Sequence, residues 1–442
     1  MKILFISLGC DKNLVDSEEM LGILQNKKDI SFTDNEEEAD VIIINTCCFV
    51  NDAKEESINT IIEMARYRTE GRCSSLIVTG CLAQRYKSEI IKEIPEVDAV
   101  IGTSSIEAIL DVVEKLGKEK NKIELYESLD KPVYADKKRV ITTGGHYAFL
   151  KIAEGCNKCC SYCIIPSIRG SYRSVPLGQL VKKAEELAEM GVKELILVAQ
   201  ETTVYGVDIY KKKMLPQLLS KLCDVKGIFR IRILYCYPEE ITEELIAVIK
   251  SQDKICNYLD IPIQHASDKI LKAMKRRTTK AQLIEIINRL RSEIPDIILR
   301  TTLISGFPGE TKEDHQELIN FVKDMRFDRL GVFAYSPEEG TPAADMDMQV
   351  SEEVKEERRN ELMEIQQDIA FELSEEKIGR EMVAMIEGRI VDENAYLGRT
   401  YMDAPEVDGN VFITTDEELI TGDFVKVLIT GAAGYDLIGE IV

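Results

Sequence analysis

Short apolar runs alternate with amphipathic stretches through residues 1–117. Apolar runs of about four to eight residues are typical of strands buried in a parallel sheet, and the stretches between them are typical of helices that cover it. The pattern predicts an amino-terminal parallel α/β domain. The expected strands are residues 2–8, 41–45, 76–80 and 99–102, and the expected helices are residues 15–25, 53–66, 83–93 and 105–116.

The pattern changes twice before residue 345. Residues 118–146 are rich in Lys, Glu and Asp and contain Pro132 and a Gly-Gly pair, which predicts a linker. Repeated strand and helix signals then occupy residues 147–345 and predict an incomplete, TIM-type parallel (β/α)6 barrel, whose active face would be the carboxyl end of the strands. The expected strands are residues 148–153, 195–199, 228–234, 258–261, 297–303 and 329–334, and the expected helices include residues 180–190, 243–250, 279–291 and 312–325.

The last hundred residues have two further patterns. Residues 346–377 are heavily charged, but Leu362, Ile365, Ile369 and Leu373 recur at three- to four-residue steps, which predicts a long helix lying on the barrel with a solvated outer face. Residues 378–442 form short strands separated by turn residues. They predict a small antiparallel β-barrel as a separate domain.

Composition narrows the class of protein. The chain has 442 residues, 12 cysteines and a formal net charge of -22. With neither a targeting segment nor a membrane span evident, we expect a cytoplasmic protein whose cysteines bind metal or react, because disulfide frameworks belong to oxidising compartments. The acidic charge disfavours nonspecific binding to nucleic acid and favours a basic partner, although a charge that only maintains solubility is an equal alternative.

The strongest chemical signal is a CxxxCxxC array formed by Cys156, Cys160 and Cys163, directly after a predicted strand. Three thiolates at this spacing can bind three irons of a [4Fe-4S] cluster and leave the fourth iron open for chemistry. Zinc is the main alternative. Structural zinc sites usually have four ligands in paired short spacings, however, and no second pair or histidine lies near.

A second cysteine set follows successive strands of the first predicted sheet: Cys10, Cys47 and Cys81. The carboxyl ends of parallel strands meet at one edge of a sheet, so these thiols should lie close together. We expect them to bind a second cluster, with buried structural cysteines as the alternative.

These motifs resemble a known family. The CxxxCxxC array is similar to that of radical S-adenosylmethionine (SAM) enzymes, and the sequences SLGCDKNLVDSE, NTC and TGCLA resemble the amino-terminal domain of the methylthiotransferases. The form GCxKNxVDSE looks like the RimO branch, which modifies a ribosomal protein. The transfer RNA branch, of the MiaB type, usually reads GCQMN there. Residues 378–442 resemble a TRAM domain.

The resemblance implies two [4Fe-4S] clusters, SAM and an electron donor such as flavodoxin or ferredoxin, in a protein expected to be a monomer. It implies that Tyr162 packs beside the adenine of SAM and that the loop containing Gly306 and Gly309 contacts its adenosine. Gln200 and Glu201 would either contact SAM or substrate or only close their loop. No catalytic residue beyond the cluster ligands is assigned.

The implied reaction adds a methylthio group to the β-carbon of an aspartate in the twelfth small-subunit ribosomal protein. Residues 376–442 hold 14 Asp and Glu against 5 Lys and Arg, so the last domain should repel phosphate and attract a basic protein. The alternatives are methylthiolation of a transfer RNA adenosine, or a non-catalytic iron-sulfur redox or assembly protein.

Overall fold

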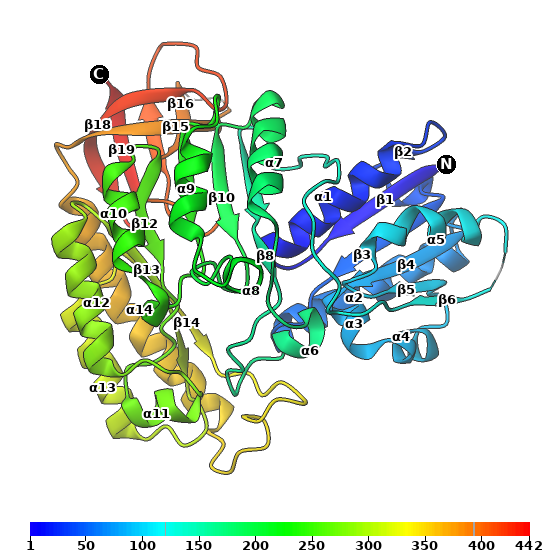
Figure 1. The fold of residues 1–442 in the computed structure, drawn as a ribbon, viewed down its shortest axis with the longest axis horizontal. Helices are drawn as coiled ribbons and strands as arrows, with labels where there is room; N and C mark the ends of the chain where they lie inside the picture. Colours follow the sequence, from blue (N-terminus) through cyan, green and yellow to red (C-terminus); the bar gives the residue numbers. More distant parts are fainter. Residues whose placement is uncertain (120, 392–393) are drawn as a thin grey trace.

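The computed structural model describes residues 1–119, 121–391 and 394–442, which form three units in chain order (Figure 1). The first is a six-stranded, all-parallel sheet with the order β2-β1-β3-β4-β5-β6. Its strands are β1 (Lys2–Ser7), β2 (Ser31–Phe32), β3 (Val41–Thr46), β4 (Ser75–Gly80), β5 (Ala99–Ile101) and β6 (Ile123–Leu125). Its helices are α1 (Asp11–Gln25), α2 (Asn51–Thr69), α3 (Cys81–Tyr86), α4 (Ser88–Glu93) and α5 (Ile109–Leu116).

The four predicted strands of this sheet are present, and every residue of β3 and β4 is buried. The helix predicted over residues 83–93 is divided into α3 and α4 at Lys87, whose φ of 50° interrupts it. Strands β2 and β6 were not predicted, because β2 is two exposed residues long and β6 is a short edge strand with a central Glu. Strand β6 lies within the segment predicted as a linker and pairs with β5.

The second unit is an open sheet of six parallel strands in the order β14-β13-β12-β11-β10-β7. Neighbours in the chain are neighbours in the sheet, and this confirms the predicted incomplete (β/α)6 barrel. Its strands are β7 (Tyr147–Lys151), β10 (Glu194–Val198), β11 (Arg230–Ile233), β12 (Ile255–Asp260), β13 (Ile298–Ser305) and β14 (Arg329–Ala334). A two-stranded ribbon of β8 (Ala153–Glu154) and β9 (Arg173–Ser174) follows β7.

Helices cover the outside of this barrel. The longer ones are α7 (Leu177–Glu189), α9 (Leu215–Cys223), α10 (Glu243–Ser251), α12 (Lys280–Glu293) and α13 (Lys312–Met325), and the short ones are α6 (Ile165–Arg169), α8 (Val207–Tyr210) and α11 (Asp268–Ala273). The Thr279 and Gln282 side chains form the capping box that starts α12. The five longer helices pack their apolar sides on the strands in one continuous core, whereas Ile168 of α6 belongs to the core of the first domain.

Helix α14 (Glu352–Glu375) packs on α13, β13 and β14, which confirms the long helix predicted from the spacing of its apolar residues. Leu362 and Ile369 are buried in the barrel core. Two charged residues, Lys355 and Arg358, are also buried, although the sequence pattern indicated a solvated charged surface. The helix therefore contacts the barrel through charged as well as apolar side chains.

The third unit is a closed five-stranded barrel with the order β15-β16-β17-β19-β18. Its strands are β15 (Glu381–Arg389), β16 (Ala395–Arg399), β17 (Val411–Thr414), β18 (Phe424–Ala433) and β19 (Asp436–Ile441). The barrel predicted as antiparallel has one parallel pair, β17 with β19, and its other pairs are antiparallel. This pair arises because the β18–β19 hairpin closes the barrel onto β17.

This third unit lies at the amino ends of the central strands (Figure 1). Tyr147, the first residue of β7, donates a hydrogen bond from its hydroxyl to Glu406 at 3.2 Å. Glu194, the first residue of β10, is fully buried against Arg399 at 2.8 Å and Arg232 at 3.0 Å. Arg399 holds the pKa of Glu194 at about 2, although burial alone would raise it. The small barrel thus closes the central barrel at the end opposite the cysteine loops.

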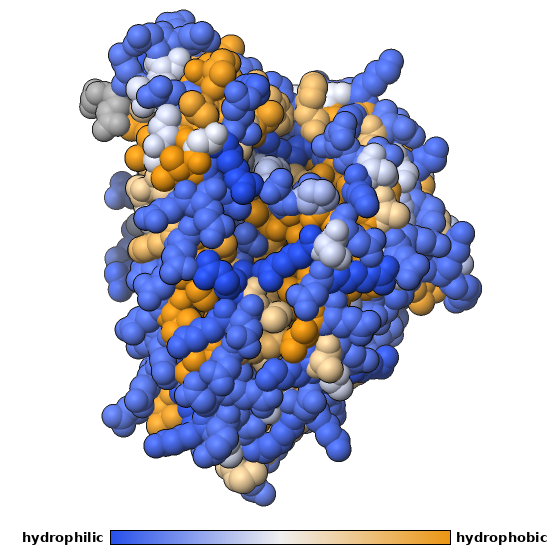
Figure 2. Space-filling view, turned by 90° about the vertical axis from the view of Figure 1, so that its left-hand side faces the viewer, coloured by the Kyte–Doolittle hydropathy of each residue, from blue (hydrophilic) through white to orange (hydrophobic). Residues whose placement is uncertain are grey.

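Polar and charged residues dominate the face shown in Figure 2, with apolar residues in smaller patches between them. No helix in the described part of the chain is long and apolar enough to cross a membrane.

Candidate functional site

The first three candidate cysteines follow three neighbouring strands. Cys10 comes after β1, Cys47 directly after β3, and Cys81 directly after β4, and these strands are adjacent in the sheet. Gly9 has a φ of +90°, and a Cβ on it would lie 2.9 Å from the Cys47 Sγ. Burial raises the pKa of Cys47 and of Cys81, and the neighbouring Cys10 adds to both shifts. The structure therefore brings these three thiols together at one edge of the sheet.

The other three candidate cysteines lie in the loop after β8, at the carboxyl end of the barrel. The Cys163 backbone N–H donates to the Cys160 carbonyl at 3.1 Å. Burial raises the pKa of Cys163 to about 12 and that of Cys156 to about 11, and Cys160 adds to both shifts. Cys159, which is out of register with the motif, is exposed and has a left-handed φ of 55°.

Cysteine thiols are the usual ligands of iron-sulfur clusters, so the chemistry of both donor sets fits such a group. Burial raises the pKa of the Cys47, Cys81, Cys156 and Cys163 thiols, and a bound cationic centre would reverse that shift. Among the described residues, no three Cys, His, Asp or Glu side chains converge as they stand on a point where one metal ion could be held. The six-cysteine ligand set therefore stays a prediction.

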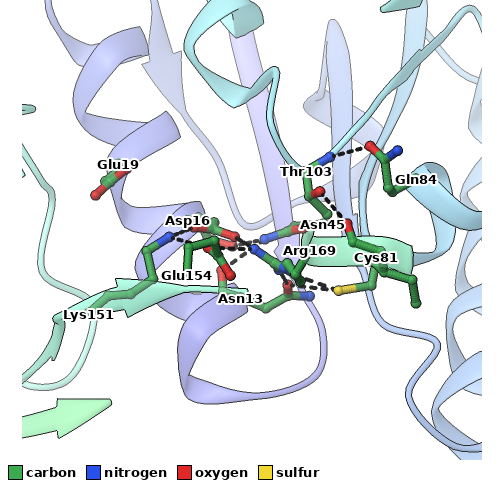
Figure 3. Close-up of polar contacts among 12 residues, drawn as sticks. Asn13, Asp16, Glu19, Asn45, Cys81, Gln84, Thr103, Lys151, Glu154 and Arg169 are labelled. Atoms are coloured by element: carbon green, nitrogen blue, oxygen red, sulfur yellow. Dashed lines mark hydrogen bonds and ion pairs between the residues drawn. The ribbon is translucent and has the colours of Figure 1, made fainter. Parts of the chain in front are cut away.

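A buried network of charges joins the two cysteine regions (Figure 3). Arg169, at the end of α6, donates to Asp16 of α1 at 2.6 Å and to Glu154 of β8 at 3.2 Å. Its other terminal nitrogen contacts Asn13 and lies 3.4 Å from the Cys81 Sγ. Lys151 also donates to Asp16 and Glu154. Because Arg169 is only 2% exposed, the network is shielded from water.

The network joins the carboxylate of Asp16, in the first domain, to acidic and basic residues of the barrel. Burial alone would raise the pKa of Glu154, but Arg169 and Lys151 hold it well below its usual range. These ionised groups fix α1 of the first domain against β8 and α6 of the barrel. Sequence reasoning missed them, although the charged residues Lys151 and Glu154 in an otherwise apolar stretch were a signal that buried partners exist.

Gln200 and Glu201 follow β10 and lie beside the cysteine loop. Gln200 donates to Glu154 at 2.8 Å, which joins it to the charge network. Glu201 is 1% exposed, receives a hydrogen bond from Thr203 at 2.5 Å and lies 3.4 Å from Lys158 of the cysteine loop. Burial raises the pKa of Glu201 to about 7. Both side chains thus contact residues around their own loop. A contact of either with SAM or substrate stays a prediction.

Tyr162 lies close to the loop that contains Gly306. Tyr162 packs in an apolar cluster with Phe307, Met274 and Tyr335. Gly306 has a φ of +72°, and a Cβ on it would lie 2.3 Å from the Lys355 side chain. The close approach that requires glycine here is thus the approach of α14, and the predicted contact with SAM stays a prediction. Gly309 has a φ of +81°, and its predicted contact with SAM also stays a prediction.

Two residues after the central strands have left-handed backbones that only glycine adopts easily. These are Tyr235, with a φ of 60°, and Gln264, with a φ of 73°. They follow β11 and β12 at the same end of the barrel as the cysteine loop. Left-handed residues also precede β13 and β14 at the opposite end, namely Asp296 and Arg326, so this strain does not distinguish the two ends of the barrel.

Family comparisons divide the chain in the same way as the fold. Residues 2–102 match the uncharacterized protein family UPF0004, residues 150–322 match the Radical SAM superfamily, and residues 378–442 match the TRAM domain. In solved structures, the fold is similar to that of the radical SAM methyltransferase TsrM from Kitasatospora setae. The TM-score is 0.56 at 13% identity, and the match covers 77% of this chain and 73% of that one.

Several curated proteins are similar over their full length. The ribosomal protein uS12 methylthiotransferase RimO of Lachnoclostridium phytofermentans is 62% identical over 440 residues, which is 99% of each chain. The RimO proteins of Acetivibrio thermocellus and Clostridioides difficile are each 51% identical, over 100% of this chain and 98% and 99% of theirs.

The fold, the cysteine array and the matched regions define a radical SAM protein with an additional domain on each side of its barrel. The chain belongs to the RimO family of ribosomal protein uS12 methylthiotransferases. The family predicted from the motif around Cys10 is confirmed.

Proposed function

We propose that this protein adds a methylthio group to the β-carbon of an aspartate side chain in ribosomal protein uS12. The observation that carries this proposal is the 62% identity to a RimO protein over 99% of both chains. The reaction replaces a carbon–hydrogen bond that has no acidic proton, so no side-chain base could start it. A cofactor must therefore supply the difficult step.

Cys156, Cys160 and Cys163 would hold a [4Fe-4S] cluster whose open iron binds SAM. When bound, cluster and SAM supply the radical chemistry that removes the hydrogen atom. Tyr162 lies next to Cys160, and its ring adds to the apolar wall formed by Phe307. These side chains would orient the cofactor and exclude water from it.

Cys10, Cys47 and Cys81 would hold a second cluster, which would carry the sulfur. One SAM would supply the methyl group to that sulfur, and a second SAM, at the first cluster, would supply the radical. The protein's part is to keep the two cluster sites within reach of one substrate carbon. Arg169 serves this purpose because it contacts Cys81 on one side and Glu154, two residues before Cys156, on the other. The distance between the sites is thereby set by buried ionic contacts rather than by a flexible connection.

The substrate protein would be recognised by its positive charge. The excess of acidic residues in the last domain supports binding of a basic protein and opposes binding of a phosphate backbone. An electron donor such as flavodoxin or ferredoxin would reduce the first cluster.

The test separates the two cysteine sets in reconstituted protein. Cys163→Ala should stop SAM cleavage, measured as 5′-deoxyadenosine. Cys81→Ala should leave SAM cleavage and abolish methylthiolation, measured by mass spectrometry of uS12. Cys159→Ala is the matched control for the first loop, and Cys73→Ala, a buried cysteine of the same domain, is the control for the second.

Equal loss of both activities in the two variants would contradict the division of labour. Mass spectrometry of uS12 and transfer RNA from cells with and without the gene tests the substrate itself. A methylthio group that disappears from transfer RNA and not from uS12 would overturn the proposed function.

A further inference from the structure

Lys12 is a buried lysine whose ammonium group forms no salt bridge in the described structure, and the nearest carboxylate is that of its neighbour Asp11. It is 7% exposed, and the Nζ lies 3.4 Å from the centroid of the Tyr235 ring. Within residues 1–119, 121–391 and 394–442, no carboxylate forms a salt bridge with this ammonium group. Attraction to an aromatic face offsets only part of the free energy needed to bury an ammonium ion. Asp11 adds attraction from a distance, so what the ammonium group lacks is a carboxylate at hydrogen-bond distance.

The position of Lys12 places this charge between the two candidate cluster regions. Lys12 is two residues after Cys10, in the first domain. Tyr235 belongs to the barrel, where its backbone N–H donates to Asp260 at 3.0 Å and its hydroxyl donates to Asp11 at 3.1 Å. The left-handed backbone of Tyr235 is thus held from both domains, directly beneath the ammonium group.

Other cations around this end of the barrel already have acidic partners. Such pairs are Arg169 with Glu154, Lys158 with Glu240, and Arg300 with Asp260. A charge that is already matched gains little from a second carboxylate. Lys12 should therefore gain more from binding an incoming carboxylate than the three paired cations do.

Arg276 is a second cation to consider, because its Nε and one terminal nitrogen have no hydrogen-bond partner in the described structure. It lies over the Tyr237 ring at 4.2 Å, and its polar or charged neighbours include Cys160, Tyr162 and Glu239. That position is beside the CxxxCxxC loop, on the side where SAM is expected. Lys12, in contrast, is beside the loop of Cys10.

We propose that Lys12 binds the carboxylate of the substrate aspartate and so selects an acidic side chain. This inference rests on the proposed function. The carboxylate is bonded to the carbon that reacts, so it must enter the closed site together with that carbon. A carboxylate removed from water needs a cationic hydrogen-bond donor, and an ammonium group supplies one.

The experiment pairs two forms of the enzyme with two forms of uS12. Wild-type and Lys12→Met holoenzyme are each titrated with uS12 carrying either the target aspartate or asparagine, and the dissociation constant and the rate of methylthiolation are measured. The wild type should bind the aspartate form about 30-fold or more tightly than the asparagine form, as expected when a buried charge loses its partner. In Lys12→Met this ratio should fall close to one.

Lys28→Met is the matched control, because it removes the same charge from an exposed position of the same domain. It should keep the wild-type preference for aspartate, and Lys12→Arg should restore part of it. The comparison of the aspartate and asparagine forms of uS12 uses the wild-type enzyme, so it does not depend on whether an enzyme variant folds. A wild type that binds both forms equally would overturn the inference, and so would a Lys12→Met enzyme that keeps the full preference.

The two proposals fail in different ways. A wild type that modifies neither form of uS12 would overturn the proposed function and this inference together. A wild type that modifies the aspartate form, with a preference that is independent of Lys12, would overturn only the inference. A Lys12→Met enzyme that has lost affinity for both forms equally would show that Lys12 only fixes the domains, and this too would overturn it.

Discussion

Arg169→Met is expected to loosen the first domain from the barrel. The guanidinium group lies 2.6 Å from Asp16 and 3.2 Å from Glu154. At an effective dielectric constant of about 20, each contact amounts to roughly 5 to 6 kcal/mol of Coulomb attraction. Desolvation offsets much of this attraction, so the net loss when one partner of such a buried group is removed is about 3–5 kcal/mol.

The free energy lost in Arg169→Met should be large because of the buried charges that remain. Without Arg169, two buried carboxylates share the single positive charge of Lys151. Amide hydrogen exchange of β8 and α6 measures the opening of this interface, and about 3–5 kcal/mol corresponds to roughly a hundredfold to a few thousandfold more frequent opening. Methylthiolation should fall more than SAM cleavage, because only methylthiolation needs both cluster sites.

Arg72→Met is the matched control. Arg72 pairs with Asp40, but its side chain is 55% exposed, so the loss should be about 1 kcal/mol or less. Exchange in Arg169→Met that is no faster than in Arg72→Met would refute the reasoning that the buried network fixes the two domains together.

Two further predictions concern the barrel and its contacts. Gly306→Ala should lower the free energy of unfolding by about 2–4 kcal/mol, because left-handed backbone strain adds to the clash with Lys355, whereas Gly309→Ala, which meets only one methyl group at 3.4 Å, should lose about 1–2 kcal/mol. Thermal unfolding of the two variants measures this, and equal losses would contradict it. The folded-state pKa of Glu194 is about 2, below the usual 4.5, so its contribution of about 3 kcal/mol is fully present above pH 4.5 and is lost as the pH falls toward 2. In denaturant unfolding, the difference in free energy of unfolding between the wild type and Glu194→Gln should shrink over that range. A difference that does not change with pH would show that the charge of Glu194 is not what stabilises the contact with Arg399.

Periodicity was sufficient to predict the three folded units, because each contains long buried segments whose local pattern matches its structure. Strands β3 and β4 consist only of buried residues, so they were evident in the sequence. Strand β6 was not, because an Ile-Glu-Leu edge strand depends on its partner β5 for its conformation. Short edge strands lack the local signal on which such predictions rest.

The candidate site was predictable only where rare residue types recur at fixed places. The cysteines met this condition. The network of Arg169, Asp16 and Glu154 did not, because its members are up to 153 residues apart and ordinary in type. The burial of Lys355 and Arg358 on α14 was missed for the same reason, since nothing local indicates that Lys355 packs on Gly306.

The small barrel beneath the central strands sets a minimum reach for anything that this protein recognises at two points. Strands of four to eight residues separate that barrel from the cysteine loops, which is roughly 13–26 Å at 3.3 Å per residue. A short free peptide could occupy only one of these places at a time. A macromolecule that binds the small barrel and also places a side chain at the cysteine loops must lie along the outside of the protein. Its shape is then selected together with its sequence.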